Sequence, residues 1–156
     1  MSFMTSKIKP LKGIQISNAL NHDVEIYSKN TLPYTVHGGV DKLVVCNTAP
    51  AWHPGEHWIA IYIDKSGVGE YFDSMGHHPL LYGFDRFMDT NSLRWSYNDK
   101  CIQKYDSNVC GYHVVCYCLS KKKNISLFDY TNAFFNDEHA LNDSMVVYVV
   151  EKMKLL

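Results

Sequence analysis

The chain has 156 residues, of which 46% are hydrophobic and 20% are charged. This length suffices for one domain with a hydrophobic core, and we expect a single domain over residues 1–156. The formal net charge of −1 gives no electrostatic basis for strong nucleic-acid binding. No apolar run is long enough to predict a membrane span, and the first ten residues lack the apolar core of a signal peptide.

The five cysteines follow no spacing that is typical of a disulfide framework. An odd number of cysteines without such a spacing is typical of a reducing compartment, where thiols stay free. We therefore expect an intracellular protein with five free thiols.

The first half of the chain predicts a helix, a loop and a hairpin. Residues 11–21 give a weak helix signal, and residues 23–40 predict a loop because proline and glycine interrupt any regular pattern. Residues 43–46 suit a short buried strand. Residues 57–64 are apolar on both faces, as in a central strand. A glycine-containing turn and the returning residues 70–73 complete the hairpin.

The second half predicts an amphipathic helix over residues 80–88 and two short strands over residues 93–97 and 100–104. An apolar helix follows over residues 110–120. Asn142 or Asp143 is expected to cap a last helix that extends to about residue 154. Residues 126–135 show no clear preference. Strands in the middle of the chain, with helices before, between and after them, predict an α+β fold. We expect a central mixed sheet packed against the buried helix that begins at Cys110.

The helix that begins at Cys110 is apolar all round, which is typical of a buried helix. Ser107 or Asn108 is placed to cap its first turn. The helix dipole and the free N–H groups of a first turn favour a thiolate there. Gly111 lacks a side chain and would let a substrate approach the backbone. Cys110 is therefore a candidate nucleophile, and the alternative is an inert cysteine in a capped core helix.

A cysteine nucleophile needs a base, a group that orients the base, and donors for an oxyanion. His57, at the start of the central strand, is the candidate base, and the hairpin brings Asp73 back towards it. The sequence does not fix the register of the hairpin, and each residue alone also suits a surface position. Gln103, seven residues before Cys110, is a candidate oxyanion donor with the backbone N–H of Cys110. Taken alone, Gln103 also suits an exposed position.

Three segments, in this order, resemble the cysteine protease clan that contains adenovirus-type maturation proteases and SUMO-deconjugating proteases. They are His57-Trp58-Ile59-Ala60, Tyr71-Phe72-Asp73-Ser74-Met75-Gly76, and Gln103 with Ser107-Asn108-Val109-Cys110-Gly111-Tyr112. The third segment is most similar to the adenain-like proteases of large DNA transposons and small DNA viruses. Residues 72–76 are also similar to SUMO proteases. The resemblance covers residues 43–120.

The resemblance implies one cysteine protease domain in which Cys110 is the nucleophile, His57 the base, Asp73 its orienting acid and Gln103 an oxyanion donor. It also implies that Trp58 packs beside the base and narrows the substrate channel. Cleavage is then expected next to a small residue, preferably glycine. The implied substrate is a viral or transposon capsid precursor, in the host cytoplasm or nucleus and in the virion.

Two other functions fit the same segments: a deconjugase of ubiquitin-like modifiers, and a non-catalytic virion or binding protein on the same fold. Adenovirus-type proteases are stimulated by DNA and by a viral peptide that is disulfide-linked to a cysteine upstream of the glutamine. The corresponding region near Ser92 has no cysteine. The missing cysteine argues against such a peptide, and the net charge of −1 argues against activation by DNA. We also expect a monomer that acts on polypeptides without a cofactor and away from membranes.

Histidines form two weaker patterns. Four of them suggest a zinc site: His53, His57, His77 and His78. Pro54 and Gly55 break any helix between the first two, and no cysteine pair is near, so we expect no metal. His113, one turn after Cys110, is a rival base, but it shares a helix with the thiol and no orienting acid is obvious.

Overall fold

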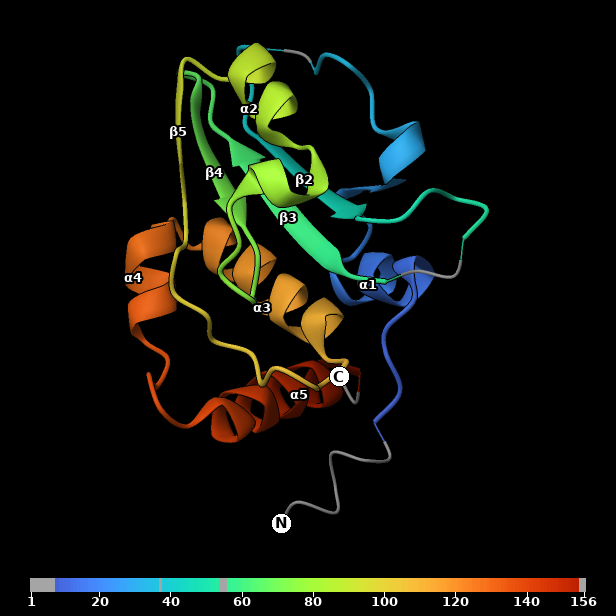
Figure 1. The fold of residues 1–156 in the computed structure, drawn as a ribbon, viewed down its shortest axis with the longest axis vertical. Helices are drawn as coiled ribbons and strands as arrows, with labels where there is room; N and C mark the ends of the chain where they lie inside the picture. The colour runs from blue at the N-terminus through green and yellow to red at the C-terminus, as the bar shows by residue number, and fades with distance from the viewer. Residues whose placement is uncertain (1–7, 37, 54–55, 155–156) are drawn as a thin grey trace.

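The computed structural model describes residues 8–36, 38–53 and 56–154, so the signal-peptide prediction lies largely outside the described residues. A five-stranded sheet separates two sets of helices (Figure 1). The strands, which are neighbours in chain order, are β1 (Glu25–Ser28), β2 (Lys42–Asn47), β3 (Trp58–Ile63), β4 (Val68–Phe72) and β5 (Arg94–Tyr97). The inner strands pair antiparallel and each edge strand is parallel to its neighbour, so the sheet is mixed.

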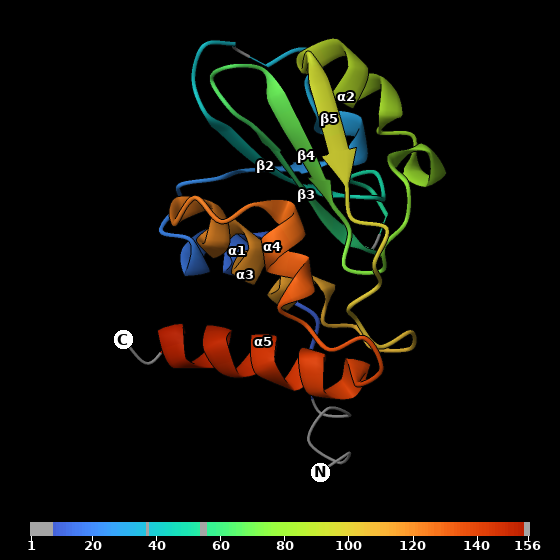
Figure 2. The same ribbon diagram turned by 90° about the vertical axis from the view of Figure 1, so that its left-hand side faces the viewer.

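The helices are α1 (Gly13–Ala19), η2 (Lys29–Thr31), η3 (Pro79–Tyr82), α2 (Asp85–Asn91), α3 (Cys110–Lys122), α4 (Leu127–Asn132) and α5 (His139–Lys154). The short helices η3 and α2 cover one face of the sheet. On the other face α3 packs against β3, and α5 lies beyond α3 (Figures 1 and 2). Because α3 is enclosed between the sheet and α5, its sequence is apolar on every side. Among the described helices, none has the length and apolarity to cross a membrane.

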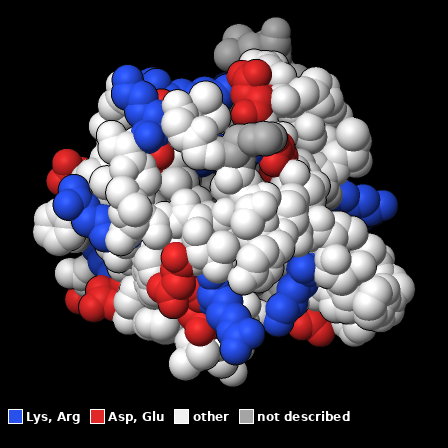
Figure 3. Space-filling view, turned by 90° about the horizontal axis from the view of Figure 1, so that it is seen from above, with Lys and Arg blue, Asp and Glu red and all other residues white. Residues whose placement is uncertain are grey.

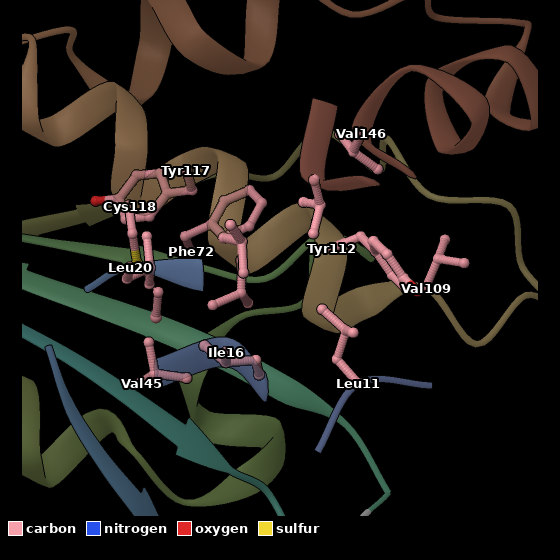
Figure 4. Packing of buried hydrophobic residues seen from close by; sticks show 14 of the residues in the cluster. Leu11, Ile16, Leu20, Val45, Phe72, Val109, Tyr112, Tyr117, Cys118 and Val146 are labelled. Atoms are coloured by element: carbon pink, nitrogen blue, oxygen red, sulfur yellow. The ribbon is translucent and has the colours of Figure 1, made fainter. Parts of the chain in front are cut away.

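Two cores form on the two faces of the sheet because side chains alternate along each strand. Ala60 and Phe72 face α3, where Phe72 stacks on Tyr117 with 4.7 Å between ring centroids (Figure 4). Ile59 and Ile61 face α2 and η3. The α+β prediction is confirmed, and so is the packing of a mixed sheet against the buried helix that carries Cys110.

Several element predictions were wrong in detail. The expected loop over residues 23–40 contains β1, which pairs parallel to β2 at the sheet edge. The expected helix over residues 80–88 is split into η3 and α2 by Gly83, whose φ of 79° ends the first piece. Residues 100–104 form no strand.

Both predicted helix caps were also wrong. The residue before α3 is Val109, and it makes no side-chain cap bond, since Ser107 binds elsewhere. The last helix begins at His139, so Asn142 and Asp143 lie inside it and are buried. Their polar groups hold neighbouring segments: Asn142 bonds to the N–H and the carbonyl of Phe135, and Asp143 bonds to His113.

Candidate active site

The hairpin register brings His57 and Asp73 together. Ala60 pairs with Phe72 in the β3–β4 ladder, so residues 57 and 73 lie on one face just beyond its last pair. His57 Nε2 lies 2.7 Å from Asp73 Oδ1, which also accepts the Met75 N–H at 2.8 Å. Asp73 is fully buried. A carboxylate on Nε2 fixes the ring and leaves Nδ1 as the other ring nitrogen for a partner.

The other group that acts on His57 is Cys110, the first residue of α3. Hydrogen bonding and charge from its thiol contribute to the raised pKa of His57. The backbone N–H of Trp58 donates to Cys110 Sγ over 3.4 Å, so the start of β3 orients the sulfur as well. Cys110 is only 6% exposed, but it lines a cleft of about 500 Å³ together with His57, Trp58 and Gln103. Access to the thiol is therefore through this cleft.

Two opposing effects act on the pKa of His57. Burial lowers it, whereas the hydrogen bonds to Asp73 and Cys110 and the negative charge of both partners raise it. The partners prevail and raise the pKa of His57 from 6.5 to about 10. The site therefore favours a proton on the imidazole of His57.

The main chain of Asp73 is held by a side chain that the sequence did not indicate. The amide of Asn98 accepts the Asp73 N–H at 3.0 Å and donates to the Asp73 carbonyl at 2.6 Å. Asn98 directly follows β5, so its side chain extends the parallel β4–β5 pairing by one step. Asp73 Oδ2 is buried without a hydrogen bond from any described residue, and His77 Nδ1 lies 3.6 Å from it.

Gln103 is 2% exposed and lies at the cleft beside Cys110. Its Oε1 accepts the hydroxyl of Ser74 at 2.5 Å. Its Nε2 donates to the carbonyl of Ser107 at 3.0 Å and to the Ser107 hydroxyl at 3.1 Å. The amide is therefore turned with its N–H groups towards the Ser107 segment. The first N–H groups of a helix have no intrahelical acceptor, so the Cys110 N–H is a second available donor.

Trp58 lines the cleft, and its indole N–H donates to the carbonyl of Leu11 at 3.0 Å. The segment before α1 thereby forms one wall of the cleft, which the sequence did not suggest. Gly111 has a packing role that the sequence did not indicate. A Cβ atom there would lie 3.0 Å from Leu11 Cβ and 3.4 Å from the Trp58 ring, so glycine permits this close approach. Gly111 itself is not part of the cleft lining.

The rival base His113 is fully buried, and its Nε2 lies 2.9 Å from Asp143 Oδ1. The sequence showed no obvious orienting acid, and the structure supplies Asp143, but the pair joins α3 to α5 and does not line the cleft. Burial lowers the pKa of His113 in spite of this carboxylate. Within the described part of the chain, no three histidine, cysteine or acidic residues are grouped to hold a metal ion. Pro54 and Gly55, which entered the zinc prediction, lie outside the described residues.

The other four cysteines lack a polar partner of the kind that His57 gives Cys110. Burial raises the pKa of each of these thiols, to about 12 for Cys46 and Cys116. All five cysteines are free. Cys110 is thus distinguished by its partners, because Cys101 and Cys116 are more exposed than it is.

No protein-family model matches this chain, and no curated protein sequence matches it. Its fold is similar to part of a solved structure, the selenomethionine form of the ASFV pS273R protease, with a TM-score of 0.43 and 22% sequence identity. The similarity covers 64% of this chain and 40% of the other, so the chain spans less than half the length of that protein. Function is therefore inferred from the geometry of the cleft.

Sequence reasoning missed three groups around the site: Ser74, Asn98 and the wall that contains Leu11. Asn98 carries a weak signal, as a polar residue directly after a strand. Ser74 and Leu11 carry none, because their contacts join segments distant in the chain: Gln103 is 29 positions after Ser74, and Trp58 is 47 positions after Leu11.

Proposed function

We propose that this protein is a cysteine endopeptidase that cleaves next to a small residue, preferably glycine, and that it matures viral or transposon capsid precursors. The observation that carries the proposal is the bridge from Cys110 through His57 to Asp73, at the N-terminus of a helix and inside a cleft. The raised pKa of His57 favours a protonated imidazole beside the Cys110 sulfur, which is the arrangement that a cysteine nucleophile needs.

In the first half of the reaction, Cys110 Sγ attacks the scissile carbonyl carbon and the carbonyl electron pair moves to oxygen. The Cys110 N–H and a Gln103 N–H bind the oxyanion, which requires one Gln103 N–H to leave Ser107. When the C–N bond breaks, protonated His57 gives its proton to the departing amine. Asp73 stays ionised and holds the ring through Nε2.

In the second half, His57 takes a proton from water, whose oxygen attacks the thioester carbon. Collapse of the second tetrahedral adduct breaks the C–S bond and releases the new carboxyl group. Cys110 returns as the thiolate beside protonated His57, so the cycle needs no other reactant.

Trp58 and the segment containing Leu11 form a wall of the cleft that Cys110 also lines, and we propose that this wall narrows the passage to the sulfur. A narrow passage admits a backbone without a side chain more readily than a bulky residue, which supports the preference for glycine. We further propose that activity needs no DNA. Lysine, arginine and acidic residues are interspersed on the face seen in Figure 3, which supports this part of the proposal.

The test is digestion of a peptide library with glycine at varied positions, followed by mass spectrometry of the products. We expect cleavage after glycine by the wild type and none by Cys110→Ala, whereas Cys118→Ala retains activity. No cleavage by the wild type would contradict the protease proposal and favour a binding protein. Much faster cleavage of ubiquitin or SUMO fusion proteins than of every peptide would favour a deconjugase.

A further inference from the structure

Ser74 directly follows Asp73, and its hydroxyl contacts the Gln103 amide. The Ser74 Oγ to Gln103 Oε1 distance is 2.5 Å, and Ser74 is fully buried. The Ser74 carbonyl also accepts the N–H groups of Ile102 at 2.9 Å and Gln103 at 3.1 Å. Main-chain and side-chain bonds from one residue therefore hold the Gln103 segment.

In the hydrogen bond between Ser74 and Gln103, the donor and the acceptor can be assigned. Gln103 Nε2 faces the Ser107 carbonyl, which can only accept a hydrogen bond. If the Gln103 amide were turned by 180°, its oxygen would face the Ser107 carbonyl oxygen, and two acceptors would meet without a proton. The amide nitrogen is therefore assigned to the Ser107 side. The amide oxygen then faces Ser74, and because this oxygen can only accept, Ser74 donates.

We propose that Ser74 is a positioning residue that fixes the Gln103 amide oxygen and so keeps the N–H groups on the Ser107 side of the cleft, from which one of them turns to the oxyanion. This inference rests on the proposed function, in which Gln103 donates to the oxyanion. Without the Ser74 hydroxyl, Oε1 would be buried with no donor, and rotation of the amide would cost less. The N–H groups would then be aimed correctly for only part of the time, and preorganised donors are what lower the barrier in this type of site.

The turn at residues 73–76 serves both sides of the site. Asp73 orients His57, and the next residue, Ser74, orients Gln103. Asn98 and Gly76 fix the main chain of the turn, since the Asp73 carbonyl accepts the Asn98 amide at 2.6 Å and the Gly76 N–H at 2.8 Å. The acid–base pair and the oxyanion donor are therefore set by one short segment.

The test is a double-mutant cycle on a glycine-containing peptide, with Ser74→Ala, Gln103→Ala and the double variant. Loss of one oxyanion donor costs about 10²–10³ in kcat, and we expect Ser74→Ala to cost roughly 10–100-fold with KM nearly unchanged. In the Gln103→Ala background Ser74→Ala should lower kcat by less than about two-fold, because the amide it orients is gone. An equal loss of kcat in both backgrounds would overturn the proposal.

Two comparisons separate positioning from general damage. Ser120→Ala removes another buried serine hydroxyl, which donates to the Tyr117 carbonyl at 2.6 Å, and should leave kcat unchanged. Alkylation of Cys110 by iodoacetamide forms no oxyanion, so Ser74→Ala should leave its rate unchanged. Slower alkylation in proportion to kcat would overturn the proposal. If Ser74→Ala does not fold, Ser74→Cys, with similar shape and a weak S–H donor, takes its place in the kcat measurement.

A readout without turnover tests the contact itself. In ¹⁵N spectra, Ser74→Ala should speed the exchange of the Gln103 side-chain amide protons with water, while Ser120→Ala should not. An unchanged exchange rate of the Gln103 amide protons in Ser74→Ala would overturn the proposal that Ser74 positions this amide. Failure of the wild type to cleave any peptide would instead contradict the proposed function, so the two failures are distinguishable.

Discussion

The indole N–H of Trp58 donates to the main-chain carbonyl of Leu11 over 3.0 Å. This bond ties the segment before α1 to the first residue of β3, next to Cys110. The Trp58 ring also lies against Gly13, where an added Cβ atom would be 3.3 Å from Trp58 Cη2. One wall of the cleft therefore depends on a single tryptophan.

Trp58→Phe should lower the free energy of unfolding by about 1–3 kcal/mol, because it leaves the carbonyl of buried Leu11 without its donor. Movement of the wall should also raise KM for peptides more than it lowers kcat. Urea unfolding and steady-state kinetics measure the two effects. The control is Trp52→Phe, since Trp52 is 78% exposed. Equal effects of the two variants would contradict the assigned role.

The pKa of His57 should be far above 6.5, at about 10, and should fall in Asp73→Asn, which removes a charged hydrogen-bond partner. NMR titration of the imidazole nitrogens measures it. Because the folded-state pKa is raised, its contribution to stability is complete below pH 6.5 and is lost as the pH rises towards 10. A wild-type His57 pKa near 6.5 would contradict the bridge between Cys110 and Asp73.

His57→Ala and His113→Ala should fail in different ways. His57→Ala should lower kcat/KM by at least about 10²-fold, the usual scale of a general acid–base group, in a protein that still folds. His113→Ala should lower the free energy of unfolding by about 1–3 kcal/mol, because it removes a buried hydrogen-bond partner of the Asp143 carboxylate. Kinetics on the folded fraction and denaturant unfolding separate them, and a His113→Ala defect in kcat alone would contradict the assignment.

Gly111→Ala should destabilise the protein although alanine favours helices. The new Cβ atom would meet Leu11 Cβ at 3.0 Å, and overpacking of this kind costs about 1–3 kcal/mol, against a gain of up to about 1 kcal/mol in helix propensity. A net loss of about 1–2 kcal/mol is expected in thermal or urea unfolding. Gly38→Ala is the control, since nothing lies within 4 Å of its added Cβ atom. A Gly111→Ala variant more stable than the wild type would contradict this prediction, because it would show that Leu11 moves away from the new Cβ atom without cost.

The sequence predicts the parts of the fold whose pattern is local. The apolar run of β3 and the apolar helix from Cys110 were predicted because burial on all sides leaves few polar positions. β1 was missed, since this edge strand is only half-buried at each of its four residues and looks like loop. The caps of α3 and α5 were predicted wrongly. Ser107 bonds back to the turn before it, at Lys104 and Gln103, and not to the helix. Asn142 and Asp143 bond to distant segments from inside α5.

For the site, the hairpin pattern predicted that His57 and Asp73 approach one another, and the β3–β4 register gives the pairing that the sequence left open. The surroundings were not predictable. Ser74 and Leu11 act through contacts across the chain, and Gly111 was assigned to substrate approach because its Leu11 neighbour could not be foreseen. The roles of Cys110 and Gln103 remain predictions for kinetics.

The most direct test of the nucleophile is intact-protein and peptide mass spectrometry after reaction with a peptide whose C-terminal glycine carries a vinyl sulfone. Cys110 is 6% exposed, whereas Cys101 and Cys116 are more accessible, so accessibility alone would label the latter two. We predict one adduct, on Cys110, that is absent in Cys110→Ala and forms much more slowly in His57→Ala. Labelling of Cys101 or Cys116 in preference to Cys110, or no adduct on the folded wild type, would contradict a cysteine protease mechanism at this site.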